Sequence, residues 1–249
     1  MDFGNRVAIV TGGASGIGAA AAELLNQRGA RVFVLDVRDG AGGLPAIHTD
    51  VARFDEVQAA VDSIAAQTGG IDIVVAAAGI QTYGTALTTT DAEWDRTLNI
   101  NLRGVWNVAR AAIPHMRGRG GSIVIVSSVQ ALATQRNVFA YATSKHALTG
   151  LTRSMALDFA ADGIRVNEVC PGSVDTPMFA ASAALDPDPD SVYEACARMH
   201  PLGRIAKSEE IAEVIAFLAH PAASFVTGAV WTVDGGLLTL IGGVPKVAK

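Results

Sequence analysis

Short, continuously apolar runs alternate with alanine-rich segments of helical periodicity along the chain, and this alternation limits the folds open to it. Runs such as VAIV and VFVL are apolar at every position, which is typical of strands buried on both faces. The strand candidates are residues 6–11, 31–36, 46–50, 71–76, 122–127, 164–169 and 229–233. The helical patterns between them cover residues 16–28, 54–67, 91–117, 138–161 and 208–219.

Strands that alternate with helices form right-handed crossovers and a parallel sheet between two helix layers. The sequence therefore predicts an α/β fold with a single Rossmann-type, doubly wound sheet of about seven parallel strands and helices on both faces. No repeat, charge block or Pro/Ser linker divides the chain, so we expect residues 1–249 to form one domain.

Two segments interrupt the alternation. The glycine-rich residues 37–45 follow the second strand and predict a short loop in place of a crossover helix. A longer excursion at about residues 172–204 contains Pro177, Pro187 and Pro189, and long loops within compact domains are usually lids or binding loops. We expect this excursion to cover the substrate.

Composition excludes several classes of protein. The 249 residues are 50% hydrophobic with a net charge of −5 and four lysines, which argues against a disordered chain and against nucleic-acid or membrane-surface partners. The apolar runs are far shorter than the ~18 residues of a spanning helix. Cys170 and Cys196 belong to no metal-binding pattern, so no metal is expected. The N-terminus shows no targeting leader, which predicts a cytoplasmic protein.

The first strand candidate ends in the run TGGASGIG at residues 11–18, and a helix pattern follows at once. Glycines at this place let the backbone turn tightly and approach a pyrophosphate, whose charge meets the helix N-terminus. The spacing is GxxxGxG, and its position between the first strand and the first helix predicts a dinucleotide-binding loop. The residues expected to bind the cofactor here are Gly12, Ser15, Gly16, Ile17 and Gly18.

Asp36 closes the second strand candidate, 18 residues after Gly18. A carboxylate at this place accepts hydrogen bonds from the adenosine ribose hydroxyls and repels a 2′-phosphate. Arg38 is a candidate phosphate ligand, but the glycine loop itself carries Ser15 and no basic residue. The sequence therefore favours NAD over NADP as the cofactor.

Tyr141 and Lys145 lie four residues apart, on one face of a helix pattern. A free phenol titrates near ~10 and is a poor base at neutral pH, but an adjacent cation favours the phenolate and lowers the pKa. Ser128 lies at the carboxyl edge of the fifth strand candidate, where open α/β sheets bind ligands, and can hydrogen-bond a substrate oxygen. The neighbouring Ser127 is a rival for that role.

Over essentially its whole length the chain resembles the classical short-chain dehydrogenase/reductase family. The resemblance rests on several motifs along the chain. They are the TGxxxGIG run at residues 11–18, Asp50-Val51, Ala78-Gly79, Asn101 within NINL, Ser128, Tyr141, Lys145, the run PGSVDT from Pro171 to Thr176, Thr227-Gly228 and Asp234-Gly235-Gly236.

The resemblance implies a catalytic set of Asn101, Ser128, Tyr141 and Lys145. Tyr141 would be the acid/base and Ser128 would orient the substrate oxygen. Lys145 would bind the nicotinamide ribose and lower the pKa of Tyr141, and Asn101 would hold a water that links Lys145 to solvent. Further cofactor contacts implied by the resemblance come from Asp50, Val51, Ala78, Gly79, Tyr141, Lys145, Pro171, Gly172, Val174 and Thr176.

Two departures from the family pattern concern the cofactor. Many relatives carry Asn-Asn-Ala-Gly after the fourth strand, where this chain has alanines at positions 76–78 before Gly79. Side-chain hydrogen bonds that hold this segment in relatives are therefore lost. The short loop after Asp36 replaces a helix that many relatives have beside the adenine.

The candidate substrate residues are Ser128, Gln130, Gln135 and Tyr141, with Gln81 on a third segment that borders the cleft in the family. Glutamine side chains suit a hydroxylated substrate, because hydrogen bonds to several hydroxyls discriminate strongly. We therefore expect a polyol or sugar-like alcohol. His200 and Arg204 flank the return of the excursion, and solvated positions are favoured for them over contact with an anionic substrate.

These observations predict an NAD(H)-dependent oxidoreductase that interconverts a secondary alcohol and a ketone, with Tyr141 as the acid/base. One alternative is an NADPH-dependent 3-oxoacyl thioester reductase, which Asp36 and Ser15 disfavour. Another is a non-catalytic nucleotide-binding scaffold, which has no need of the four catalytic residues together. The family uses its long helices to form dimers and tetramers, so a homotetramer is expected.

Overall fold

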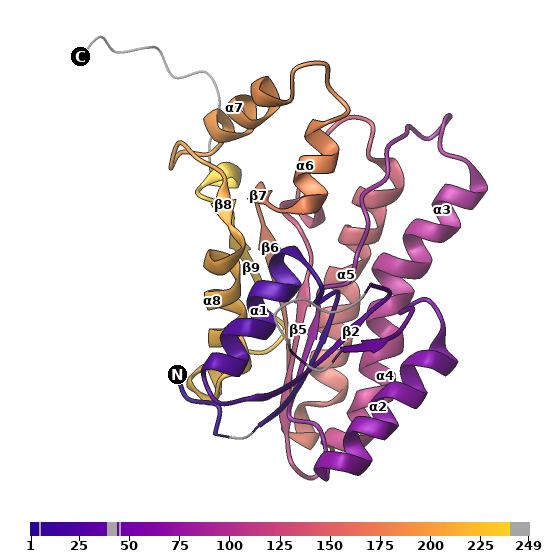
Figure 1. Cartoon of the computed structure of the whole chain (residues 1–249), viewed down its shortest axis with the longest axis vertical. Helices are drawn as coiled ribbons and strands as arrows, with labels where there is room; N and C mark the ends of the chain where they lie inside the picture. Colours follow the sequence, from indigo (N-terminus) through magenta and orange to yellow (C-terminus); the bar gives the residue numbers. More distant parts are fainter. Residues whose placement is uncertain (5, 39–43, 45, 240–249) are drawn as a thin grey trace.

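The computed structural model describes residues 1–4, 6–38, 44 and 46–239, and its centre is a sheet of seven parallel strands (Figure 1). The strands are β1 (Val7–Thr11), β2 (Arg31–Asp36), β3 (Ala46–His48), β4 (Ile73–Ala76), β5 (Gly121–Val126), β6 (Ile164–Pro171) and β9 (Val230–Val233). Their order is β3-β2-β1-β4-β5-β6-β9, so the chain reverses direction across the sheet between β1 and β4. This doubly wound arrangement confirms the predicted fold and creates a ligand crevice at the carboxyl ends of the strands.

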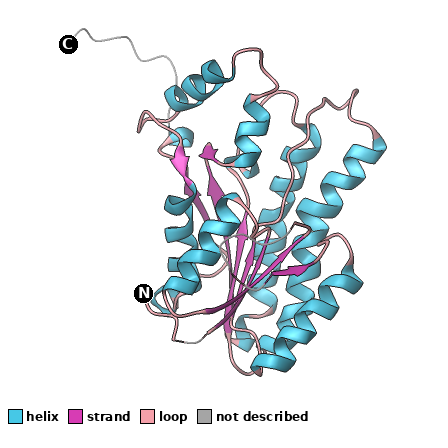
Figure 2. Ribbon diagram, viewed as in Figure 1, coloured by secondary structure: helices cyan, strands magenta, loops and turns pink. Residues whose placement is uncertain are grey.

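Helices cover both faces of the sheet (Figure 2). On one face α1 (Gly16–Gln27) packs beside α8 (Ser208–Ala219). On the other face lie α2 (Phe54–Thr68), α4 (Gly104–Met116) and α5 (Phe139–Asp158). Short 3₁₀ turns complete the chain at η2 (Val129–Ala131), η3 (Ala160–Asp162), η4 (Pro221–Ala223) and η5 (Leu237–Thr239).

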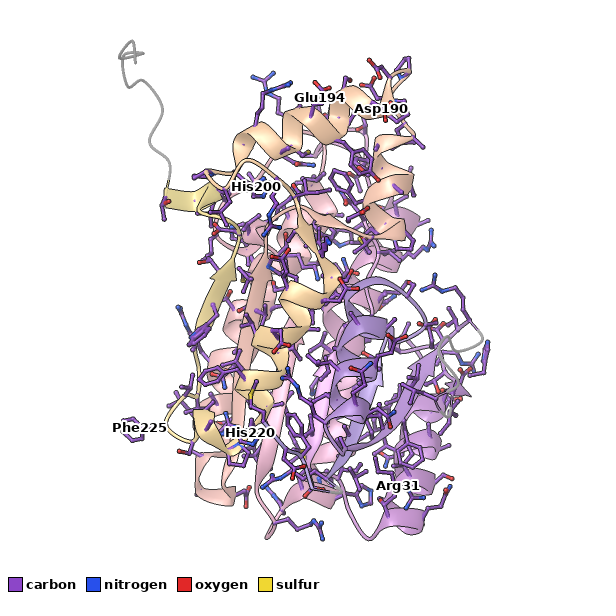
Figure 3. All side chains as sticks on the ribbon, turned by 60° about the vertical axis from the view of Figure 1, so that its left-hand side comes forward. Arg31, Asp190, Glu194, His200, His220 and Phe225 are labelled. Carbon is purple, nitrogen blue, oxygen red and sulfur yellow. The ribbon has the colours of Figure 1, made fainter. Side chains whose placement is uncertain are left out.

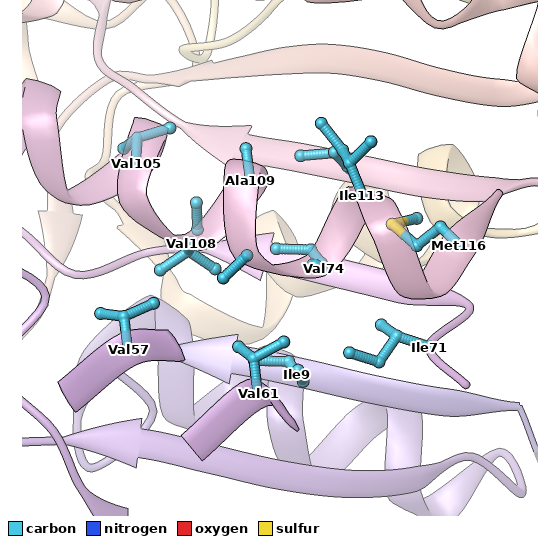
Figure 4. Close-up of a cluster of buried hydrophobic side chains, with 14 of the residues drawn as sticks. Ile9, Val57, Val61, Ile71, Val74, Val105, Val108, Ala109, Ile113 and Met116 are labelled. Carbon is cyan, nitrogen blue, oxygen red and sulfur yellow. The ribbon is translucent and has the colours of Figure 1, made fainter. Parts of the chain in front are cut away.

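Each face of the sheet has its own hydrophobic core. Because side chains alternate along a strand, Ile9 and Val74 point toward α2 and α4, while their neighbours point toward α1 and α8. Figure 4 shows Val57 and Val61 of α2 close to Val108 of α4, which packs beside α2 on this face of the sheet. Burial on both faces explains why the strand sequences are apolar at every position.

Two strands are shorter than their apolar runs because side chains and loops take over the backbone hydrogen bonds. Asp72, predicted as part of the fourth strand, accepts a hydrogen bond from Val7 N through its carboxylate at 2.8 Å, and its carbonyl accepts from Ser122 N. The third strand ends at His48, two residues before its predicted end; Thr49 N still donates to Asp36 O, but Asp50 N donates to the Glu56 carboxylate of α2.

The helix predicted over residues 91–117 is divided in the structure. It consists of α3 (Asp91–Leu98), a π-helical turn η1 (Asn99–Arg103) and α4. A π turn inserts one extra residue into the helical repeat, and such turns occur frequently at functional sites. The extra residue rotates the buried Asn101 toward the segment after β4, which the apolar periodicity does not reveal.

The excursion at residues 172–204 is not a structureless loop. It contains β7 (Val174–Asp175), α6 (Pro177–Ala183) and α7 (Pro189–Met199), and β7 pairs with β8 (Ala206–Lys207). Pro177 and Pro189 occupy the first turns of these helices, where a missing N–H costs nothing, so the prolines start helices here. Figure 1 shows α6 and α7 above the carboxyl ends of the strands, and we call residues 172–204 the lid.

Most of the short loop predicted after Asp36 lies outside the described residues, at positions 39–43 and 45. Within the described part of the chain, no helix is long and apolar enough to cross a membrane.

Candidate active site

A cavity of about 860 Å³ follows the carboxyl ends of the central strands beneath the lid. It brings together all predicted cofactor and substrate residues. They are Gly12, Ser15, Gly16, Ile17, Gly18, Asp36, Asp50, Val51, Ala78, Gly79, Ser128, Gln130, Gln135, Tyr141, Lys145, Pro171, Gly172, Val174 and Thr176. Of the predicted catalytic set, Asn101 alone does not line this cavity.

The glycine loop forms a close-packed floor for a dinucleotide. Gly12 has φ +68°, and a Cβ there would lie 2.7 Å from the Ala78 backbone. A Cβ on Gly18 would lie 2.2 Å from the carbonyl oxygen of Gly12, so α1 can approach β1 only without a side chain. The N-terminus of α1 at Gly16 lines the cavity and presents free backbone N–H groups. These features fit the pyrophosphate of a nicotinamide dinucleotide.

The adenosine end of the cavity carries two opposite charges. Asp36 is buried at the end of β2, and its Oδ2 accepts a hydrogen bond from Ala14 N at 3.0 Å. Arg38 is exposed and donates from Nε to Asp36 Oδ1 at 3.4 Å and from its terminal nitrogen to Ser15 Oγ at 2.8 Å. The guanidinium thus connects the end of β2 to the glycine loop. Sequence reasoning considered Arg38 only as a phosphate ligand.

The catalytic end is buried. Tyr141 and Lys145 lie on the first turns of α5, and Lys145 Nζ is 5.6 Å from the centroid of the Tyr141 ring. The ammonium donates to the carbonyl oxygen of Val126 at 3.1 Å. Within the described residues no carboxylate lies within ion-pair distance of Lys145.

Burial shifts the pKa of both groups. It raises the pKa of Tyr141 to about 12, although hydrogen bonding with the Ser128 side chain opposes this rise. Burial likewise lowers the pKa of Lys145 to about 8, because a low-dielectric environment disfavours any charged form. Burial therefore raises the pKa of Tyr141, where the sequence predicted that Lys145 would lower it.

The structure distinguishes the two neighbouring serines. Ser128 lines the cavity, interacts with Tyr141 and accepts a hydrogen bond from Gln130 N at 3.1 Å. Ser127 lines the cavity as well, but it is buried and its Oγ has no hydrogen-bond partner among the described residues. The interaction with the phenol favours Ser128 for the role of orienting a substrate oxygen.

Asn101 fixes the segment that lacks the family's asparagines. Its Oδ1 accepts from Ile80 N at 2.8 Å, and its Nδ2 donates to Ile80 O at 2.9 Å and to Ser144 Oγ at 3.1 Å. Ala78 N also donates to Thr11 Oγ1 at 3.3 Å. The lost side-chain hydrogen bonds are therefore replaced by bonds from β1 and from the π turn. Asn101 acts here through the backbone at Ile80, and the water relay stays a prediction.

Sequence reasoning missed a buried carboxylate beneath the catalytic residues. Glu168 of β6 is fully buried, its Oε1 lies 3.6 Å from Cys170 Sγ, and its Oε2 has no partner among the described residues. Glu168 opposes the effect of burial on Lys145 by raising the pKa of the ammonium. Burial also raises the pKa of the Cys170 thiol to about 12, which makes it unreactive. Strand periodicity gives no signal for a buried glutamate.

The substrate end is formed by polar side chains of the core and apolar side chains of the lid. Gln81, Gln130 and Gln135 line it, together with Met178 and Phe179 of α6. The buried Oε1 of Gln130 has no partner among the described residues. The Tyr83 hydroxyl donates to Ser182 Oγ of α6, a contact between the core and the lid that sequence reasoning missed.

The predicted solvated position of His200 is wrong. His200 is 3% exposed, because the end of α7 folds back onto Gly172 and Gly235. Arg204 is exposed as expected, and both terminal nitrogens of its guanidinium bind the Glu210 carboxylate, at 2.7 and 2.6 Å. Neither residue lines the cavity, and the described part of the chain holds no cluster of three metal-ligating side chains.

Comparison with known proteins identifies relatives over nearly the whole chain. The family described as Enoyl-(Acyl carrier protein) reductase matches residues 12–238. Cis-4-hydroxycyclohexanecarboxylate dehydrogenase of Sinomonas cyclohexanicum is 44% identical, covering 94% of this chain and 97% of that protein. The 3-oxoacyl-[acyl-carrier-protein] reductase FabG of Thermotoga maritima is 37% identical, covering 96% of this chain and 100% of that protein.

A solved structure agrees closely with the fold. Ligand-free aldohexose dehydrogenase of Thermoplasma acidophilum superposes with a TM-score of 0.94 at 40% identity, covering 98% of both chains. The chain belongs to the short-chain dehydrogenase/reductase family. It is accordingly an oxidoreductase that acts on alcohol groups with a nicotinamide cofactor.

Proposed function

We propose that the protein interconverts a secondary alcohol and a ketone with NAD(H), using Tyr141 as the acid/base. The observation that carries the proposal is the placement of the buried Tyr141 and Lys145, together with Ser128, at one end of a cavity whose other end is the glycine loop and Asp36. The nicotinamide ring, when bound, supplies hydride transfer to or from the substrate carbon. The residues of the chain hold the oxygen and move the proton.

Each residue has a distinct task in this chemistry. Ser128 Oγ hydrogen-bonds the substrate oxygen, and the Tyr141 hydroxyl gives a proton to that oxygen during ketone reduction. In alcohol oxidation the phenolate of Tyr141 takes the hydroxyl proton. Lys145 holds a positive charge near the phenol and binds the nicotinamide ribose. A pKa of about 12 keeps Tyr141 protonated at neutral pH, which suits the reduction direction.

Asp36 supports NAD as the cofactor. Its carboxylate lies at the end of β2 and lines the cavity, where a 2′-phosphate would meet negative charge. A comparison of kcat/KM for NADH and NADPH tests this proposal. We expect NADH to be preferred, and a strong preference for NADPH would overturn the role of Asp36.

The substrate we propose is a polyol or sugar-like alcohol. Gln130 supports this choice because it lines the cavity, where its side-chain amide can hydrogen-bond a substrate hydroxyl. A ligand without hydroxyls leaves this amide unpaired at a cost in free energy, so the glutamine favours hydroxylated substrates. The aldohexose dehydrogenase relative is consistent with a sugar-like substrate. A panel of polyols, diketones and hydroxysteroids tests it.

A second candidate is an NADPH-dependent 3-oxoacyl thioester reductase. Arg38 favours it, because an exposed guanidinium bound to Ser15 could receive a 2′-phosphate, and the FabG relative has this activity in its name. The cavity also has apolar lining from Met178 and Phe179. Asp36 counts against it, and the comparison of kcat/KM for NADH and NADPH distinguishes the two functions. The relatives, which are dehydrogenases and reductases, argue against a non-catalytic scaffold.

We further propose a cytoplasmic homotetramer. Two separate surfaces carry exposed apolar side chains, which suits two kinds of subunit contact. Trp106 of α4 and Leu157 of α5 are exposed on helices that cover one face of the sheet, and Trp231 is exposed on the edge strand β9. Phe225 is exposed as well, and Figure 3 shows it projecting from the body of the protein. Sedimentation of the purified chain tests the assembly, and a monomer would contradict it.

A further inference from the structure

Within the lid, His200 joins helix α7 to the segment that follows β6 through two hydrogen bonds. It follows the last residue of α7, and Figure 3 shows it between the lid helix and the body of the protein. Its Nε2 lies 3.1 Å from Ser173 N, and its Nδ1 lies 2.7 Å from the carbonyl oxygen of Cys196. Ser173 in turn accepts a hydrogen bond from Ala206 N at 2.9 Å, which starts the β7–β8 pairing.

These partners determine the protonation state of the ring. The Ser173 N–H can only donate, so Nε2 accepts and carries no proton. The ring proton of the neutral form is therefore on Nδ1, where it donates to the Cys196 carbonyl. The neutral Nδ1–H tautomer satisfies both partners, whereas the imidazolium would place two donors 3.1 Å apart.

The packing leaves the ring little room to adapt. A Cβ on Gly172 would lie 2.6 Å from His200 Nε2, and a Cβ on Gly235 would lie 3.5 Å from His200 Cβ. The imidazole therefore fits between two glycines that follow the ends of β6 and β9. A ring turned by repulsion from Ser173 would collide with these backbones or leave its pocket.

We propose that His200 is a positioning residue whose neutral imidazole couples the lid helix α7 to the cofactor-side segment at residues 171–176. Protonation of Nε2 breaks the bond to Ser173 and releases α7 from the segment at residues 171–176. This inference rests on the proposed function, because the cofactor contacts of residues 171–176 belong to that proposal. It adds a pH-dependent control that lies outside the catalytic set.

The charged side chains around His200 have hydrogen-bond or ion-pair partners of their own. On the turn after β9, the Asp234 carboxylate accepts from Gly236 N at 3.0 Å and Leu238 N at 2.9 Å. On the far side of Leu202, Arg204 is paired with Glu210. Cys196 on α7 contacts the ring through its backbone carbonyl. Among the described residues, no carboxylate forms an ion pair with the His200 ring.

Two substitutions separate the two hydrogen bonds. His200→Gln retains an acceptor that can reach Ser173 N but does not titrate. His200→Asn retains a donor for the Cys196 carbonyl but is too short to reach Ser173. His146→Gln is the matched control, because His146 Nδ1 makes the same contact to the carbonyl four residues earlier, Ala142 at 2.9 Å, and its ring has no second bond to a described residue.

The experiment measures NADH binding by fluorescence and amide hydrogen exchange of residues 173–199 for each variant across a range of acidic to neutral pH. We expect wild-type lid protection and NADH affinity to fall together as the imidazole protonates. His200→Gln should keep both without the pH dependence, and His200→Asn should lose about tenfold in affinity at neutral pH because a buried N–H is left unpaired. His146→Gln should behave as wild type.

The outcomes distinguish this inference from the proposed function. Equal pH dependence in wild type and His200→Gln would overturn the role of His200, whatever the cofactor. Suppose that hydrogen exchange of the lid depends on pH through His200 but the protein does not bind NADH. This result would support the coupling of α7 to residues 171–176 and would overturn the proposed function. Nitrogen NMR shifts of His200 provide an independent readout, and an Nε2–H tautomer at neutral pH would also contradict the proposal.

Discussion

The two ends of the cavity differ in how far their charged groups are exposed to solvent. At the adenosine end Asp36 and Arg38 lie 3.4 Å apart, and the guanidinium is open to solvent. At the catalytic end Tyr141 and Lys145 are buried without an ion pair among the described residues, and burial moves the pKa of both toward the uncharged form. A charge that recognises a ligand can remain hydrated until the ligand arrives, whereas a group that exchanges protons gains from a pKa tuned by burial.

This difference has a consequence for stability. The Asp36–Arg38 pair contributes little to the free energy of folding, because its guanidinium is exposed to solvent and the pair is 3.4 Å apart. Burial of the Lys145 ammonium opposes folding, because its pKa is about 8 in the folded chain and 10.5 when the side chain is fully solvated. The buried Lys145 should therefore lower the free energy of unfolding. Substitutions at the catalytic end should change turnover and stability, whereas substitutions at the adenosine end should change cofactor preference.

Tyr141→Phe should have the largest effect. It removes the proton donor and acceptor while the ring still fills its place, so turnover should fall by about a thousandfold or more. NADH binding should change by less than about twofold, because the ring and Lys145 remain. Steady-state kinetics and fluorescence titration check this, with Tyr193→Phe on α7 as the control for loss of a phenol hydroxyl. Substantial residual turnover would remove Tyr141 from the mechanism.

Lys145→Met should act in two directions. Turnover should fall by about a hundredfold and NADH should bind more weakly, because the cation near the ribose and phenol is lost. The free energy of unfolding at pH 7 should rise by about 1–3 kcal/mol, since the buried charge is removed. The folded-state pKa lies below the unfolded one, so this gain should shrink above pH 8 and vanish above pH 10.5. Denaturant unfolding across this range measures it, and a less stable variant at pH 7 would contradict it.

Substitutions at the adenosine end should change cofactor preference and leave the chemistry intact. Asp36→Ser removes the charge that repels a 2′-phosphate and frees Arg38, so the ratio of kcat/KM for NADPH to NADH should rise by about tenfold or more. Arg38→Ala should have the opposite effect and lower this ratio below the wild-type value, with little change in kcat/KM for NADH. Saturating kcat should stay near wild type in both variants, and a large loss of kcat would show that the two ends are not independent.

Glu168→Gln should have the smallest effect. The carboxylate raises the pKa of Lys145, so its removal should move that pKa below about 8. The pH above which ketone reduction declines should then shift toward neutrality, with a loss of activity of only a few fold at pH 7. Glu23→Gln on the exposed face of α1 is a control of equal charge change. An unchanged pH–rate profile would show that Glu168 has only a packing role.

The sequence is most informative where a residue type is compatible with only one local structure. Continuous apolar runs predict buried strands, and Gly12 and Gly18 predict a backbone approach that no other residue permits. The π turn at Asn101 was missed because one inserted residue leaves the apolar pattern of a helix almost unchanged. Pro177 and Pro189 predicted a loop because proline both breaks helices and starts them. The burial of His200 and Glu168 depends on contacts between distant segments, which no local pattern records.

The most direct test of the proposed chemistry follows the transferred hydrogen. A secondary alcohol from the substrate panel, deuterated at the carbinol carbon, is incubated with NAD⁺ and the wild-type chain, and the reduced cofactor is analysed by mass spectrometry. We predict that the reduced cofactor carries the deuterium and that Tyr141→Phe forms almost none of it. Reduced cofactor without deuterium, or equal amounts from both chains, would contradict hydride transfer assisted by Tyr141.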